Sequence, residues 1–217
     1  MANLTISAVC NQHCPYCFTG DHLGGSGSNR RFLEPGDLDA RLDFLDRSGM
    51  DQARFLGGEP TLHPHFSELV ERARARNKKI VIFTNGLMPQ ESLACLEALP
   101  ATECQVLVNV NEPAEAGEAT FERQRATIRR LGERALLGFN VYRADFRPGF
   151  LLSLIADSGC KGASAGPGTA LPLRGQCLRP PPSIRGDRRK DRALCSRRGR
   201  GQCEGRVRLR FRALHVL

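Results

Sequence analysis

The chain has 217 residues, of which 41% are hydrophobic, and a formal net charge of +9 at pH 7. This length allows one domain with a sizeable core, and no run approaches the roughly 18 apolar residues of a membrane span, so no membrane partner is expected. The charge is uneven: residues 1–160 carry 17 Lys and Arg against 20 Asp and Glu, whereas residues 161–217 carry 15 against 3. Only the tail is strongly basic, so the average charge of the whole chain describes neither part.

Short β-like runs alternate with amphipathic helical patterns over the first 160 residues. Strands are predicted at residues 4–8, 53–56, 80–84, 105–109 and 137–142, and helices at residues 37–47, 66–76, 91–99, 121–133 and 150–157. Gly49 and Gly159 mark helix ends, and Pro64 lies near a helix start. The alternation predicts an α/β fold with about five β/α units around a parallel sheet. The Gly- and Ser-rich residues 24–28 are predicted to form a mobile flap or a tolerated insertion.

Three cysteines follow the first predicted strand: Cys10, Cys14 and Cys17. Three thiolates can hold three corners of a [4Fe-4S] cluster and leave one iron open for a substrate or cosubstrate. A zinc site that recruits His13 or His22 is the alternative. Disulfides are disfavoured because the nine cysteines are an odd number and the N-terminus lacks a secretory signal pattern. We therefore expect reduced thiols and a cytoplasmic location.

Polar segments follow the other four predicted strands as well. These segments are Gly57-Gly58-Glu59-Pro60, then Asn85-Gly86, then Asn109 with Asn111, and finally residues 140–143. In parallel β/α folds the loops after the strands meet at one edge of the sheet. We therefore expect all five loops to surround one mouth. His63 and His65 are predicted to have structural roles at a helix start, and Cys95 and Cys104 to behave as small buried apolar residues.

The Cys-x3-Cys-x2-Cys run, Tyr16 before its third cysteine, Gly-Gly-Glu-Pro and Thr84-Asn85-Gly86 together resemble the radical S-adenosylmethionine (radical SAM) enzymes. The resemblance covers residues 1 to about 160. It implies a partial (β/α) barrel in which the three cysteines hold one [4Fe-4S] cluster and S-adenosylmethionine (SAM) chelates the open iron. An external electron donor of the flavodoxin or ferredoxin type would reduce the cluster. SAM cleavage would then yield a 5′-deoxyadenosyl radical that abstracts hydrogen from a substrate.

The same resemblance implies roles for single residues. Gly57 and Gly58 would let the backbone approach the methionine moiety, Glu59 would bind its ammonium group, and Pro60 would fix the turn. Tyr16 would lie near the adenine, with ordinary aromatic packing as the alternative. Amide side chains are candidates for contacts to the methionine, ribose or adenine, namely those of Asn85, Asn109 and Asn140.

The substrate expected from this resemblance is a peptide or a small molecule such as a cofactor precursor. Asn111 and Arg143 are candidates for substrate contacts or for caps of strand ends. Two other functions stay open: a radical SAM enzyme that modifies RNA through the basic tail, and a zinc-stabilised, Arg-rich nucleic-acid-binding protein. In the first case deletion of residues 161–217 would abolish RNA binding but keep the cluster.

The tail departs from the pattern of a radical SAM core, in which a sixth strand is expected after Cys160. From Lys161 the chain is instead rich in Arg, Gly and Pro, a composition typical of disorder or of an RNA-binding arm. Aromatic residues that would stack on bases are nearly absent, so nucleic acid is not expected as a partner unless the basic tail is natural.

A frameshift near codon 161 is a second explanation of the tail. Permitted codons for residues 173–191 and 201–217, read one nucleotide later, can encode a loop entering a helix and a strand followed by a cysteine pair. The core would then comprise residues 1–160, and residues 161–217 would be an out-of-frame tail. This chain could be an inactive fragment, with its fifth strand left as an exposed edge.

Overall fold

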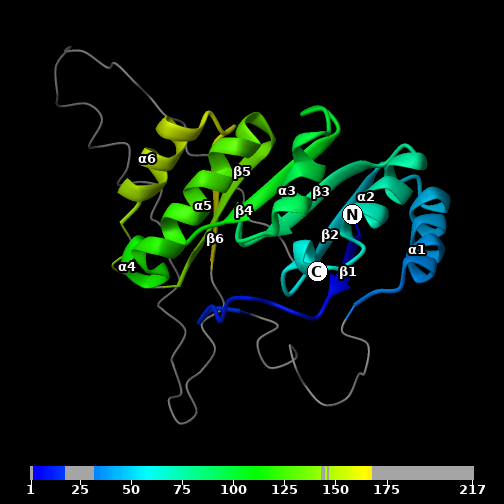
Figure 1. Cartoon of the computed structure of the whole chain (residues 1–217), viewed down its shortest axis with the longest axis horizontal. Coiled ribbons are helices and arrows are strands. Elements are labelled where there is room, and N and C mark those ends of the chain that lie inside the picture. The colour runs from blue at the N-terminus through cyan, green and yellow to red at the C-terminus, as the bar shows by residue number, and fades with distance from the viewer. Residues whose placement is uncertain (1, 18–31, 143–144, 146, 168–217) are drawn as a thin grey trace, which may run out of the picture. The chain divides into compact units, whose positions relative to one another are not determined.

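The computed structural model describes residues 2–17, 32–142, 145 and 147–167. These residues form a parallel sheet whose strands lie side by side in chain order (Figure 1). The strands are β1 (Asn3–Ser7), β2 (Gln52–Gly57), β3 (Lys79–Thr84), β4 (Cys104–Asn109), β5 (Ala135–Val141) and β6 (Ala163–Pro167). The five predicted strands and the α/β class are confirmed. Each predicted strand lies within two residues of its observed bounds.

The expectation that no sixth strand follows Cys160 is wrong, because β6 pairs in parallel with β5 from Leu137↔Ala163 to Val141↔Pro167. Its sequence, Ala-Ser-Ala-Gly-Pro, has none of the β-branched or aromatic residues that mark a strand. The backbone alone makes the pairing, which begins where Lys161 donates its N–H to the carbonyl of Ala135. The predicted exposed edge at β5 is therefore absent.

The helices that join the strands are α1 (Pro35–Arg47), α2 (Phe66–Ala75), α3 (Gln90–Glu97), α5 (Glu118–Leu131) and α6 (Gly149–Ser158). These confirm the five predicted helices. Three short pieces were not predicted, and these are η1 (Pro60–Leu62), α4 (Pro113–Ala116) and η2 (Gly132–Arg134). Right-handed crossovers in one direction along a sheet place all helices on the same face. Figure 1 shows the helices gathered on one side of the strands.

The core lies between that face of the sheet and the helices. Alternate strand residues point toward the helices. Those that are completely buried include Phe55, Ile80, Ile82, Val106 and Leu137. These strand residues pack against Leu38, Leu42 and Leu45 of α1. The three leucines recur at spacings of four and three residues and are also completely buried. Gly49 and Gly159 follow helix ends with left-handed φ angles of 64° and 66°, as the sequence predicts.

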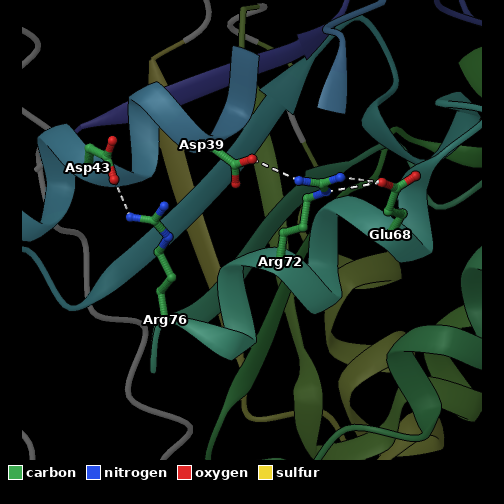
Figure 2. A network of polar contacts seen from close by, with 5 residues as sticks. All are labelled: Asp39, Asp43, Glu68, Arg72 and Arg76. Carbon is green, nitrogen blue, oxygen red and sulfur yellow. Dashed lines mark hydrogen bonds and ion pairs between the residues drawn. The ribbon is translucent and has the colours of Figure 1, made fainter. Parts of the chain in front are cut away.

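An ion-pair network covers the surface between α1 and α2 (Figure 2). Arg72 donates to Asp39 at 2.7 Å and to Glu68 at 2.8 Å, and Arg76 pairs with Asp43. These side chains are exposed to solvent, so each pair stabilises the fold little, although several share partners. In the described part of the chain, no helix has both the length and the apolar character to cross a membrane.

Candidate functional site at the carboxyl ends of the strands

The loops after the strands meet at one edge of the sheet, as predicted, and side-chain hydrogen bonds connect them. Asn11 of the cysteine loop, for example, donates from its side chain to the carbonyl of Leu87, beyond β3, at 2.8 Å. Tyr16 of the same loop contacts Asn109 at the end of β4. The site is therefore built from segments as far apart in the chain as residues 10 and 140.

The thiols of Cys10, Cys14 and Cys17 are half-buried, and none of them forms a disulfide with another described residue. A backbone hydrogen bond of 3.1 Å from Cys17 N to Cys14 O folds the loop into a turn, and Gln12 N–H donates to Cys10 Sγ at 3.4 Å. Burial raises the pKa of Cys10, and the charges of Glu59 and Cys17 raise it further. Burial also raises the pKa of Cys14, and the charges of Cys10 and Cys17 add to that rise.

This donor set fits an iron-sulfur cluster. Burial and mutual repulsion oppose three thiolates until a strongly positive centre compensates their charge. A cluster also takes each thiolate on a different iron, so the ligands need not converge on one point. In the described residues, no group of three or more His, Cys, Asp or Glu side chains is placed to hold a metal ion. His13 is exposed, and His22 lies outside the described residues.

The two glycines after β2 allow close contact with the chain that leads into the cysteine loop. A Cβ at Gly57, whose φ is 152°, would lie 2.0 Å from the carbonyl oxygen of Ser7. A Cβ at Gly58 would lie 2.4 Å from that of Val9. Gly58 N–H donates to Ser7 O at 2.8 Å across this contact. The glycines thus have a packing role that the sequence interpretation, which directed them toward SAM, missed.

Glu59 is 0% exposed, and its carboxylate is turned into the protein. Oε1 accepts hydrogen bonds from Thr61 N at 3.1 Å, Thr61 Oγ1 at 2.6 Å and Thr84 Oγ1 at 2.7 Å. Oε2 accepts one from Asn85 N at 2.7 Å. Burial raises the pKa of this carboxyl group despite these donors. Its buried position ties η1 to the end of β3, and Pro60 begins that 3₁₀ turn.

Tyr16 joins the cysteine loop to β4 and β5. Its ring is 7% exposed, its hydroxyl donates to Asn111 Oδ1, and it accepts from Asn109 Nδ2 at 2.6 Å. Asn140 Nδ2 then donates to Asn109 Oδ1 at 3.0 Å. Burial raises the pKa of Tyr16 far above its usual range, so the phenol stays protonated. Its ring centroid lies 4.9 Å from that of Tyr142.

Gln124 is a site residue that sequence reasoning missed. It lies on α5, is 0% exposed, and donates from Nε2 to the carbonyl of Asn85 at 2.6 Å and to that of Asn109 at 3.4 Å. One amide thus bridges the ends of β3 and β4. The available signal was a polar residue within the apolar stripe of α5, between Phe121 and Ile128.

His63 has the structural role that was predicted. It is 3% exposed, its Nε2 lies 2.7 Å from Leu33 O, and its Nδ1 accepts from His65 N at 3.0 Å. Burial lowers its pKa. Leu33 also donates its N–H to Ile6 O at 2.9 Å, so the chain is fixed to β1 where it enters α1. His63 is turned toward this anchor and not toward the cysteines.

Two further cysteines behave as apolar residues. Cys104 is 2% exposed at the start of β4, where burial raises its pKa to about 12, and Cys95 packs half-buried on α3. Three sequence interpretations lie outside the described residues: the flap at residues 24–28, the side chain of Arg143, and the basic tail beyond residue 167.

The chain matches the family described as "Radical SAM superfamily" over residues 4–149. An S-adenosylmethionine-dependent nucleotide dehydratase of Selenomonas ruminantium is 37% identical over 106 residues, 45% of this chain and 36% of that protein. A GTP 3′,8-cyclase of Haemophilus ducreyi is 28% identical over 139 residues, 63% of this chain and 41% of that protein. The chain thus spans well under half the length of these curated relatives.

Solved structures of Streptococcus suis SuiB have the same fold. One matches with a TM-score of 0.64 at 16% identity, covering 89% of this chain and 45% of SuiB. The structure of SuiB bound to S-adenosylmethionine matches with a TM-score of 0.63 at 15% identity, covering 79% and 40%. At this identity the likeness shows the fold alone.

The family match covers most of the described residues, from β1 to the start of α6, and contains the cysteine loop and the segments bonded to it. The cofactors of this family are a [4Fe-4S] cluster and SAM. Sequence, fold and the cluster-compatible cysteine loop thus agree: this chain belongs to the radical SAM superfamily.

Proposed function

We propose that the chain is the core of a radical SAM enzyme in which Cys10, Cys14 and Cys17 are the cluster ligands. The observation that carries this proposal is the cysteine loop, whose three thiols are half-buried and in which Cys10 Sγ accepts a hydrogen bond from Asn85 Nδ2, at the end of β3. When bound, the reduced cluster and SAM supply a 5′-deoxyadenosyl radical that abstracts hydrogen from the substrate. An external donor of the flavodoxin or ferredoxin type would provide the electron.

The protein's own residues would hold and shield the cofactors. The backbone of Gly57 and Gly58 and the amides of Asn109 and Asn140 would contact SAM, and Tyr16 would provide an aromatic wall for it. Glu59 and Pro60 fix the turn behind it. Asn85 keeps one lone pair of Oδ1 for a ligand, since its other polar groups are already bonded.

A nucleotide is the substrate class that we propose. Two groups of curated relatives carry nucleotide activities in their names, a nucleotide dehydratase and GTP 3′,8-cyclases. A solved structure of SuiB contains the precursor peptide SuiA, but at 16% identity that likeness extends only to the fold. The described cysteines form no disulfide with one another, which favours a reducing, cytoplasmic compartment.

Anaerobic reconstitution of the full chain with iron and sulfide tests the ligand set. We expect about four irons per chain, loss of that iron in Cys14→Ala, and retention in Cys95→Ala, the matched control on α3. Zinc retention without iron would contradict the proposal and support the zinc-stabilised alternative.

Turnover is tested separately by adding SAM and dithionite and measuring 5′-deoxyadenosine. The expected result is a rise in its rate of formation with GTP or another nucleotide, and no rise with an unrelated peptide. A cluster that forms without any 5′-deoxyadenosine would identify the chain as an inactive fragment. Stimulation by RNA that depends on the tail would instead support the RNA-modifying alternative.

A frameshift near codon 161 remains our proposal for the basic tail, supported by the abrupt change of charge at that point. Nucleotide sequencing decides it: no continuous open frame in the shifted register would refute it. The pairing of β6 does not distinguish a frameshift from a natural tail. Backbone N–H and C=O groups can pair in a strand whatever its side chains are.

A further inference from the structure

Asn85, the first residue after β3, is held on both sides of its main chain by buried side chains. Its N–H donates to Glu59 Oε2 at 2.7 Å, and its carbonyl accepts from Gln124 Nε2 at 2.6 Å. Both partners are 0% exposed, and Asn85 itself is 8% exposed. Since neither partner has room to move, the backbone position of Asn85 is fixed from β2 on one side and from α5 on the other.

The Asn85 side chain is directed at the cysteine loop. Its Nδ2 donates to Asn11 Oδ1 at 2.8 Å and lies 3.8 Å from Cys10 Sγ, within hydrogen-bond range for sulfur. Its Oδ1 accepts from Leu87 N at 2.9 Å, which sets the orientation of the amide. An asparagine amide has two hydrogens to donate. One goes to Asn11, and the other points at the sulfur.

The contact that holds Asn85 leaves Gln124 with an unsatisfied polar atom. Its Oε1 is buried and has no hydrogen-bond partner, although its Nε2 is fully used. A buried acceptor without a partner destabilises a protein, because it has lost its hydrogen bonds to water. An apolar residue in the α5 stripe would avoid that cost but could not donate to the carbonyl of Asn85. The amide is therefore better explained by what it positions than by packing.

We propose that Asn85 is an outer-sphere hydrogen-bond donor to the Cys10 thiolate that raises the reduction potential of the cluster, and that Glu59 and Gln124 are positioning residues for it. Reduction adds one electron, which increases negative charge on the cluster and its thiolates. An N–H directed at a ligand sulfur stabilises that charge and favours the reduced state. The inference rests on the proposed function, since it requires Cys10 to be a cluster ligand.

The experiment is a redox titration of the reconstituted full chain, followed by the EPR signal of the reduced cluster. Asn85→Leu removes the donor at similar volume, and we expect the equilibrium constant for reduction to fall about tenfold, or about 59 mV for one electron. Asn85→Ala and Gln124→Met should shift the potential in the same direction, Gln124→Met by less. Gln105→Met, at an exposed glutamine of β4, is the matched control and should leave the potential unchanged.

Iron content is measured first on each protein and separates the two proposals. A wild-type chain that binds no iron refutes the ligand assignment itself. Variants that hold about four irons but keep the wild-type potential refute only the role of Asn85. If all three variants fail to load iron while Gln105→Met loads normally, the segment is needed to hold the cluster and not to set its potential, and the inference is overturned.

Discussion

The ends of β1 to β3 and the ends of β4 and β5 face the same mouth but are built differently. At the first three strands, glycines press the backbone of β2 against that of β1, and the fully buried Glu59 closes the turn. At the other two, half-buried amides of Asn109 and Asn140 form an open chain with Tyr16. The first part is rigidly preformed around the proposed cluster, whereas the second keeps polar side chains within reach of a ligand.

Gly57→Ala should cause the largest loss of stability, because it breaks the close contact between β1 and β2 in the first part of the mouth. The added Cβ would lie 2.0 Å from Ser7 O, at a φ of 152° that side chains rarely adopt. We expect a loss of about 3 kcal/mol or more in the free energy of unfolding. Denaturant unfolding measures it.

Gly36→Ala is the control for that substitution. A Cβ at Gly36 in α1 meets nothing within 4 Å, and alanine is favoured over glycine in helices by about 1 kcal/mol. Equal stability changes for the two variants would show that the contact between β1 and β2 is not tight.

Glu59→Gln should lower the free energy of unfolding by about 2–4 kcal/mol. The carboxylate accepts four hydrogen bonds from Thr61, Thr84 and Asn85. In a carboxamide, an NH₂ group would replace one of the two oxygens and would face donors instead of acceptors. Thermal unfolding of the full chain checks this. Glu91→Gln, at an exposed position in the first turn of α3, should change stability little. A harmless Glu59→Gln would mean that the carboxyl group is protonated and already acts as a donor.

Tyr16→Phe tests the part of the mouth at the ends of β4 and β5. It should lower the free energy of unfolding by about 1–2 kcal/mol. Removing the hydroxyl leaves Asn109 Nδ2 and Asn111 Oδ1 without this partner. Because Asn109 is half-buried, water can replace its lost hydrogen bond, whereas Asn111 is buried. The comparison predicts a smaller change than for Glu59→Gln, and the reverse order would refute the distinction between the two halves.

The smallest effect is a pH dependence from His63, at the base of the preformed half. Burial places its folded-state pKa below the ordinary value of 6.5, so the unfolded chain binds the proton more readily. Stability from this group is therefore complete above about pH 6.5 and decreases as the pH falls toward the folded pKa. Unfolding curves between pH 5 and 8 should show this slope in the wild type. The slope should be weaker in His63→Gln, and identical slopes would contradict the assignment.

The five β/α units, the cysteine loop and the strand ends at which polar groups converge could all be predicted from the amino-acid sequence. Hydrophobic periodicity fixes which residues face the helices, and parallel strands bring their carboxyl ends to one edge, so this much follows from local pattern. The same pattern predicts that Cys10, Tyr16, Glu59 and the asparagines lie in loops or at strand ends along that edge.

Which side chains contact one another at that edge could not be predicted from the sequence. Glu59 is bonded within the protein, Gln124 reaches the site from the buried face of α5, and β6 forms from residues with no strand signal. Side-chain partners distant in the chain, and pairing made by the backbone alone, leave no periodic trace in a sequence. These contacts depend on packing in three dimensions, and so does the proposed donor from Asn85 to Cys10.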